Sequence, residues 1–360
     1  MSRRLMLVAL IAVLALLSVG ACLAQPAQAP AQAQAQPAFK GTLRAPISPP
    51  PVENVLLIGW DGVQRHRLLE LMVAGRLPNL WALIEEGSIE TIGVTGHATD
   101  TKSGWTQILT GYDPDVTGVY SNGRYQPIPE GLSVFERAQQ AFGRENIFTM
   151  MVNGKAVHVG SKGPGEPTGG PRGQQTEKLG QPFYNTRKAL DVWDGDKQRD
   201  APDVGAAAIS ALEKAGGKRF LAFVHFSDPD HRGHASGENS PEYEQAIITC
   251  DEWLGKLTQW VKDKGLYERT RIYVVTDHGF DEGEKSHRYA PRTWLATNDN
   301  AVMMGGHMHD ITATLLVRMG VDISKLEPAY PGHALIDAVP FLKQPARVGM
   351  RAGRARTMMQ

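Results

Sequence analysis

Between residues 52 and 343, short apolar runs alternate with longer segments whose hydrophobic residues recur every three or four positions. The short runs have the length and β-branched content of buried strands, and the longer segments have the period of amphipathic helices. Strands are expected at 55–59, 91–94, 147–152, 220–226 and 272–276. Helices are expected at 67–86, 103–110, 132–142, 204–215, 241–264 and 311–319. This alternation predicts an α/β fold with a mostly parallel central sheet and helices on both faces.

The two ends of the chain depart from this pattern. Arg3 and Arg4 precede an apolar run at 5–19, which is typical of a bacterial export signal over residues 1–24. Cleavage after Ala24 and lipid attachment at Cys22 both remain open. Residues 25–51 are rich in Ala, Gln and Pro and predict a flexible spacer, and residues 344–360 form a basic tail. We therefore expect an exported protein, either periplasmic or tethered to the membrane as a lipoprotein.

The charge and cysteine content narrow the classes of partner. Lys and Arg number 38, Asp and Glu also number 38, and the formal net charge is +0. Long-range attraction to a nucleic acid polymer or an anionic membrane surface therefore has no support, whereas a small charged substrate fits. Cys22 and Cys250 are the only cysteines, so no disulfide is expected within the domain. Nothing in the pattern predicts a protein partner.

Two predicted strands end in residues that can ligate a metal ion. Asp61 follows the first strand, and Asp277 and His278 follow the strand at 272–276, directly before Gly279. In open α/β sheets the carboxyl ends of strands form the ligand-binding edge. Adjacent Asp and His side chains can converge on one ion where a strand breaks into a loop, and glycine permits that break. Asp61 taken alone fits a helix cap slightly better than a ligand.

Two further segments are dense in metal-ligand residue types. The strand at 220–226 runs into a polar loop in which Asp230 and His234 are four residues apart, a spacing that places both on one face of a helical turn. His307 and His309 flank a methionine before a predicted helix. His307 lies beside two glycines and is the better candidate, while His309 remains an alternative.

A segment rich in hydroxyl side chains precedes the predicted helix at 103–110. Thr101 and Ser103 both lie close to the helix N-terminus. The unpaired N–H groups and the positive end of the dipole there favour an approaching phosphate and stabilise a hydroxyl as it loses its proton. Helix capping explains Ser103 well and Thr101 less well.

Taken in order, these segments resemble the alkaline phosphatase superfamily, particularly its type I phosphodiesterase and nucleotide pyrophosphatase branch. The resemblance covers about residues 55–316. Pro229-Asp230 through Gly233-His234 is similar to the family's Pro-Asp-x-x-Gly-His, and Asp277-His278-Gly279 is similar to its Asp-His-Gly. Members carry a nucleophilic hydroxyl nine residues ahead of a Thr-Gly pair, which selects Thr101 against Thr110-Gly111.

The resemblance implies an alkaline-phosphatase-like fold and two divalent metal ions that activate a hydroxyl nucleophile. It assigns one ion to Asp230, His234 and His307, and the second ion to Asp61, Asp277, His278 and the Thr101 oxygen. The mixed nitrogen and oxygen ligands suit zinc best, with manganese or iron as substitutes. The implied reaction is hydrolysis of a small-molecule phosphate ester through a phosphothreonine intermediate.

The chain departs from the diesterase pattern directly after the nucleophile. Family diesterases continue with Phe-Pro-Asn, whereas this chain has Lys102-Ser103-Gly104, so the usual pocket for the leaving nucleotide is in doubt. Asn122 is similar to an asparagine that often binds a phosphate oxygen, and Lys102 could supply a compensating positive charge.

Other functions in the same superfamily, and one outside it, remain open. A phosphomonoesterase or a phosphonate or sulfate ester hydrolase shares most of this ligand set, although a sulfatase makes its nucleophile from Cys or Ser in a Cys-x-Pro-Ser-Arg motif. A non-catalytic ligand-binding lipoprotein is the alternative of a different class. Degenerate enzymes usually lose metal ligands first, whereas here every candidate ligand position has suitable chemistry.

Overall fold

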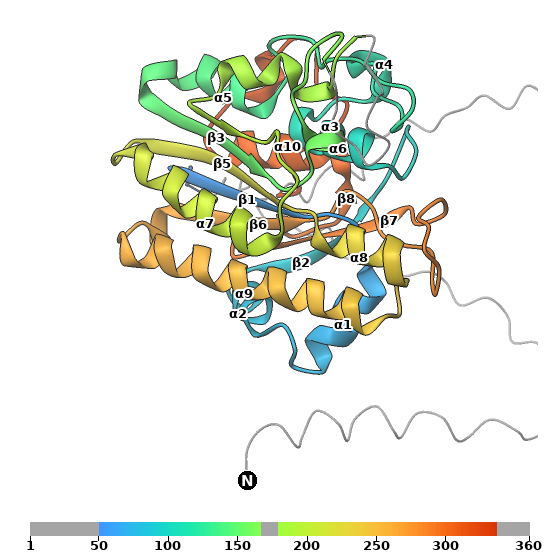
Figure 1. Cartoon of the computed structure of the whole chain (residues 1–360). Coiled ribbons are helices and arrows are strands. Elements are labelled where there is room, and N and C mark those ends of the chain that lie inside the picture. Colours follow the sequence, from blue (N-terminus) through green and yellow to red (C-terminus); the bar gives the residue numbers. More distant parts are fainter. Residues whose placement is uncertain (1–49, 167–178, 337–360) are drawn as a thin grey trace, which may run out of the picture. The chain divides into compact units, whose positions relative to one another are not determined.

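A computed structural model describes residues 50–166 and 179–336 of the chain (Figure 1). The expected export signal, nearly all of the spacer and the basic tail fall outside these residues. None of the described helices is both long enough and apolar enough to cross a membrane.

Within the described residues, the centre of the fold is an eight-stranded sheet in the order β4-β3-β5-β1-β6-β7-β2-β8. The strands are β1 Asn54–Trp60, β2 Ser88–Gly93, β3 Ile147–Asn153, β4 Val192–Asp194, β5 Arg219–Phe226, β6 Thr270–Val275, β7 Arg292–Thr297 and β8 Gly306–His307. β7 runs antiparallel to β6 and β2, and the other recorded pairings are parallel. The predicted mostly parallel sheet is therefore confirmed, with β4, β7 and β8 added to the expected strands.

Helices cover both faces of this sheet, as the alternation predicted (Figure 1). The ten α-helices of the described residues are α1 Arg65–Val73, α2 Pro78–Glu86, α3 Thr101–Thr110, α4 Pro114–Thr117, α5 Val134–Phe142, α6 Ala156–Val159, α7 Ala201–Leu212, α8 Asp228–Ser236, α9 Pro241–Asp263 and α10 Met308–Arg318. In Figure 1, α1, α2, α7 and α9 lie below the sheet, whereas α3, α5 and α10 lie above it. Because successive strand side chains point to opposite faces, β1 contributes Leu56 and Ile58 to the lower core and Val55 and Leu57 to the upper core.

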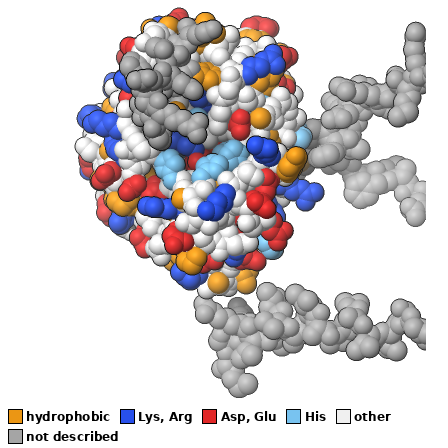
Figure 2. All heavy atoms as spheres, turned by 45° about the vertical axis from the view of Figure 1, so that its right-hand side comes forward, with side chains coloured by type: hydrophobic (Ala, Val, Ile, Leu, Met, Phe, Trp, Pro, Cys, Tyr) orange, Lys and Arg blue, Asp and Glu red, His pale blue; other side chains and the backbone are white. Residues whose placement is uncertain are grey.

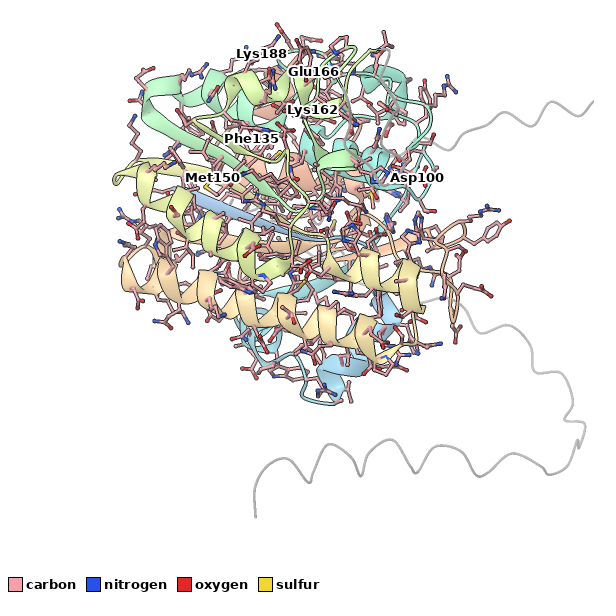
Figure 3. All side chains as sticks on the ribbon, in the orientation of Figure 1. Asp100, Phe135, Met150, Lys162, Glu166 and Lys188 are labelled. Carbon is pink, nitrogen blue, oxygen red and sulfur yellow. The ribbon has the colours of Figure 1, made fainter. Side chains whose placement is uncertain are left out.

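Figure 3 labels a residue of each core and Asp100 near the start of α3. Met150 on β3 belongs to the lower core, and Phe135 on α5 belongs to the upper core. Asp100, which directly precedes α3, lies on the right of the picture, the side on which α8 follows β5 in Figure 1. The carboxyl ends of the central strands therefore face the start of α3.

Several helices differ from the sequence-based expectation, and three of the differences bear on the arrangement of the fold and the site. The single helix expected at 67–86 is two helices, because Gly75 adopts a positive φ of 72° and Pro78 starts a new helix. The polar segment after β5 forms helix α8 instead of a loop. Helix α3 begins at Thr101, two residues earlier than expected, so Thr101 belongs to its first turn.

Gly104 allows α3 to lie directly against the segment that carries Asp277. A Cβ added at Gly104 would lie 2.7 Å from the Asp277 carbonyl oxygen and 2.8 Å from the Asp277 Cβ, which is closer than real contacts allow. We expect Gly104→Ala to lower the free energy of unfolding by about 1 to 3 kcal/mol despite its better helix propensity, because α3 must move away from Asp277. Denaturant unfolding of the metal-free protein measures this, and unchanged or higher stability would contradict the close approach.

Candidate metal centre

The carboxyl ends of four neighbouring strands converge on one site. Asp61 follows β1, Asp277 and His278 follow β6, and helix α8 after β5 carries Asp230. β3, β5, β1 and β6 are adjacent in the sheet, so their ends meet at one edge. Asp61, Asp277 and His278 are fully buried, and Asp230 is 2% exposed. The predicted convergence of these four side chains is therefore present in the structure.

The Nε2 atom of His278 lies at the centre of a group of oxygen atoms. Its distances are 3.4 Å to Thr101 Oγ1, 3.5 Å to Asp277 Oδ2 and 3.6 Å to Asp61 Oδ1. The other ring nitrogen, Nδ1, lies 2.9 Å from the carbonyl oxygen of Gly279, which assigns the ring proton to Nδ1. The lone pair of Nε2 therefore points toward these oxygens.

These spacings fit a shared divalent ion better than they fit hydrogen bonds. Ligand atoms about 2.0–2.2 Å from a tetrahedral zinc ion lie about 3.3–3.6 Å apart, which is the range found around His278 Nε2. Asp277 Oδ2 and Asp230 Oδ1 are both buried, and neither makes a hydrogen bond to a described residue. Burying a carboxylate oxygen without a hydrogen-bond partner costs free energy. A bound cation would compensate both oxygens.

A second group with metal-ligand chemistry adjoins the first. Asp230, His234 and His287 bring one ligand atom each to within 4.8 Å of one another, and Asp61, Asp230 and His278 do the same. Asp230 Oδ1 lies 3.3 Å from His234 Nε2, while His234 Nδ1 lies 2.8 Å from the Lys285 carbonyl oxygen. As in His278, the backbone contact leaves Nε2 facing the carboxylate.

His287, not His307, lies beside the other candidate ligands. The His287 ring stacks on His278 with centroids 4.0 Å apart and lies 5.0 Å from the His234 ring. His307 belongs to neither ligand group; its backbone N–H donates to Asp310 at the start of α10. The alternative, His309, places Nδ1 3.0 Å from Asp113 Oδ1. Among the described residues, the structure thus brings His287 to the other candidate ligands and does not bring His307 there.

Sequence reasoning missed His287 because its neighbours, Ser286 and Arg288, complete no motif. The glycines beside His307 drew attention instead, but Gly306 and His307 form the short edge strand β8, parallel to β2. The position of His287 along the chain could have indicated its role. His287 lies in the loop that joins β6 to β7, which is the loop that begins with Asp277, His278 and Gly279.

The ionisable groups of the site perturb one another strongly. Burial opposes ionisation of Asp61, but the Lys155 ammonium and the His225 side chain together outweigh it and hold the Asp61 pKa well below its ordinary value. Burial and the negative charge of Asp61 raise the pKa of Asp277 well above its ordinary value. Burial and the neighbouring His287 lower the pKa of His278 to about 4. Without a metal ion both shifts favour the uncharged forms of Asp277 and His278, and a bound cation would favour the Asp277 carboxylate.

Thr101 stands in the first turn of α3, at the edge of both ligand groups. Its side chain is 1% exposed, and its hydroxyl lies near His278 as described above. Asn122 accepts a hydrogen bond from the Lys102 N–H through Oδ1 at 3.0 Å, and its own N–H donates to Asp100 Oδ2 at 2.9 Å. Asn122 thus holds the start of α3 in place, and no hydrogen bond from its Nδ2 to a described residue is recorded.

A second lysine, besides the expected Lys102, brings positive charge to the site. The Lys102 Nζ lies over the Tyr125 ring, 3.1 Å from its centroid. Lys155 Nζ instead lies 3.1 Å from Thr101 Oγ1 and 2.6 Å from Asp230 Oδ2. Lys155 was missed because a single lysine after β3 forms no motif, although it follows the carboxyl end of a predicted central strand, as the other site residues do.

The site opens into a cavity of about 780 Å³. Its lining includes candidate ligands, the candidate nucleophile and further polar or charged residues: Thr101, Asn122, Lys155, Asp230, His234 and His287, together with His158, Lys162, Asp196, Gln198, Asp200, Asp228, His231 and Arg232. Figure 2 shows histidine side chains gathered at a hollow on this face of the molecule. A larger hollow of about 1010 Å³ beside Arg65 and Tyr289 contains none of the candidate ligands. The site is therefore identified by its candidate ligand residues and not by the size of its cavity.

Comparisons with curated proteins find distant relatives that are much longer than this chain. GPI ethanolamine phosphate transferase 1 of Emericella nidulans is 24% identical over 254 residues, which are 66% of this chain and 26% of that protein. Ectonucleotide pyrophosphatase/phosphodiesterase family member 1 of Mus musculus is 29% identical over 83 residues, or 23% of this chain and 9% of that protein. The matched regions thus span about a quarter or less of these relatives.

Two further comparisons, one with solved structures and one with family sequence models, concern the fold and the family of the chain. The alkaline phosphatase from the Antarctic bacterium TAB5 superposes with a TM-score of 0.50 at 14% identity, covering 76% of this chain and 99% of that one. This likeness confirms the alkaline-phosphatase-like fold. A sequence model described as type I phosphodiesterase / nucleotide pyrophosphatase matches residues 55–335, most of the chain. The chain belongs to the type I phosphodiesterase / nucleotide pyrophosphatase family.

Proposed function

We propose that the protein is an exported phosphoric ester hydrolase that depends on two divalent metal ions, with Thr101 as its nucleophile. The observation that carries this proposal is the set of three oxygen atoms 3.4–3.6 Å from His278 Nε2, one of which is the Thr101 hydroxyl. A metal site that includes a hydroxyl oxygen at a helix N-terminus is suited to nucleophilic attack on phosphorus.

Two ligand groups can be assigned from the described residues. Asp61, Asp277, His278 and Thr101 would hold one ion, and Asp230, His234 and His287 would hold the other. Nitrogen and oxygen ligands in these numbers suit zinc. Bound divalent ions would lower the pKa of the Thr101 hydroxyl and offset negative charge on the phosphoryl and leaving-group oxygens.

The chain's own residues account for positioning and bond exchange. Thr101 Oγ1 loses its proton to water and attacks phosphorus, so that a P–Oγ1 bond forms while the bond from phosphorus to the ester oxygen breaks, and that oxygen takes a proton from water and leaves as the alcohol. Thr101 at the start of α3 and Asn122 both line the cavity, so the positive end of the α3 dipole and the Nδ2 donors of Asn122 would stabilise phosphoryl oxygens there. Water then cleaves the phosphothreonine, which releases phosphate and restores Thr101.

A substrate screen with controlled metal content tests this function. Purified protein is loaded with zinc and assayed with para-nitrophenyl phosphate, its bis ester, a phenylphosphonate ester and para-nitrophenyl sulfate. We expect at least one phosphate ester to be hydrolysed in water, chelation to abolish turnover, and zinc to restore it. Turnover that survives complete metal removal would contradict the proposal, as would transfer to an added alcohol without hydrolysis. Full metal binding with no reaction on any ester would favour a ligand-binding role.

A further inference from the structure

A buried ammonium group lies between the two proposed metal sites and touches the nucleophile. Lys155 is 4% exposed. Its Nζ lies 3.1 Å and 3.2 Å from the two carboxylate oxygens of Asp61, 2.6 Å from Asp230 Oδ2 and 3.1 Å from Thr101 Oγ1. Lys155 therefore contacts one carboxylate from each ligand group and the atom proposed to attack phosphorus.

The backbone holds Lys155 in this position. The Lys155 N–H donates to Asn153 Oδ1 at 3.1 Å, and Asn153 Nδ2 donates to the Val159 carbonyl oxygen at 2.7 Å. Asn153 is the last residue of β3 and is fully buried. The lysine thus projects from the sheet edge over a fixed turn, which preorganises its charge at the site.

The charge balance of the site gives this lysine a role in selecting the substrate. This role of Lys155 rests on the function proposed above. The proposed site would contain three carboxylates, from Asp61, Asp230 and Asp277, and the ionised Thr101 oxygen. Their four negative charges would balance the four positive charges of two divalent ions, so the Lys155 ammonium adds one uncompensated positive charge. A phosphate diester carries one negative charge, whereas a monoester carries nearly two at pH 7 and above. The additional positive charge matches the additional negative charge of a monoester.

Lys155 is also placed next to the reacting group. Its Nζ lies 3.1 Å from Thr101 Oγ1, and both residues line the cavity, so a phosphoryl group bonded to Thr101 would lie beside the ammonium. Bound metal ions would engage the Asp61 and Asp230 oxygens that the Lys155 N–H groups contact, which would release an N–H donor for a non-bridging phosphoryl oxygen. We propose that Lys155 binds a non-bridging phosphoryl oxygen and makes this protein selective for phosphate monoesters over phosphate diesters.

Substitution of Lys155 by an uncharged side chain of similar length tests the inference. In the zinc-loaded wild type, kcat/KM should be higher for para-nitrophenyl phosphate than for its bis ester. Lys155→Met should lower the monoester kcat/KM by about 100-fold and the diester kcat/KM by only a few-fold, because one charge-assisted contact to the transition state is lost. Calorimetry with inorganic phosphate should show weaker binding, while metal analysis should still find both ions.

Lys162→Met is the matched control, because Lys162 lines the same cavity but has no recorded contact with Asp61, Asp230 or Thr101. It should leave the monoester-to-diester ratio unchanged. If Lys155→Met does not fold, Lys155→Gln provides the same comparison. Equal losses on both esters, or a wild type that prefers the diester, would overturn the inference while the proposed function stands. A zinc-loaded wild type that hydrolyses neither ester would overturn the proposed function itself, and the phosphate-binding comparison would then decide whether Lys155 holds a phosphoryl group.

Discussion

Thr101→Ala is expected to reduce turnover of the metal-loaded protein by a factor on the order of a thousand or more. The substitution removes the atom that would form the covalent bond to phosphorus and leaves only water to attack. The protein should still fold and bind metal, because Asp61, Asp277 and His278 remain. Steady-state kinetics measures the loss, and acid trapping of the phosphorylated wild type followed by mass spectrometry locates the phosphate.

Two matched substitutions separate the hydroxyl chemistry from the helix structure. Thr101→Ser keeps the hydroxyl and should retain substantial activity. Ser103→Ala should change turnover by no more than a few-fold, because the Ser103 hydroxyl already donates to the carbonyl oxygens of Ala98 and Asp100. Near-normal turnover by Thr101→Ala, or phosphate recovered on Ser103, would show that another hydroxyl is the nucleophile.

His287→Ala should remove one of two bound metal ions and lower kcat by about a hundredfold or more, since an ion at this centre offsets charge on the transferred group. The expectation follows from the position of His287 beside His234 and His278. Metal analysis of the purified variant, together with a lower melting temperature in zinc, provides readouts that do not depend on activity.

His307→Ala is the control for this experiment. His307 carries the same side chain but lies at the start of α10, outside both ligand groups. The variant should keep both ions and its turnover. If His307→Ala lost metal while His287→Ala kept it, the ligand set implied by the sequence resemblance would be correct and the one drawn from the geometry would be wrong.

The fold could be predicted from the sequence because its central strands are strongly apolar and its helices are strongly periodic. β1, β3, β5 and β6 are buried on both faces and therefore appear as continuous hydrophobic runs. β8 has two residues and β4 has three, and both are only partly buried, so neither leaves a comparable pattern. Such short edge strands depend on their neighbours rather than on their own sequence.

The candidate site was predictable where its residues follow strands or share a helical turn. Asp61, Asp277 and His278 lie at strand ends, and Asp230 and His234 are one turn apart on α8. His287 and Lys155 were not predictable in this way, because each reaches the site through a loop path or a side-chain conformation that the local sequence does not encode. Their assignment required knowledge of which segments meet in space.

The central position of β1 affects how the site is assembled during synthesis. β1 lies between β5 and β6, and the N–H of Gly62 donates to Asp277 Oδ1 across 215 residues of sequence. Asp61 and Thr101 therefore leave the ribosome long before their partners, and contacts so distant in sequence form slowly. Any truncated chain that ends before β6 lacks Asp277, His278 and His287, and neither ligand group is complete in it. Occupation of the two proposed metal sites would consequently be a late event in folding, and a stably bound pair of ions would mark a chain whose central sheet has closed.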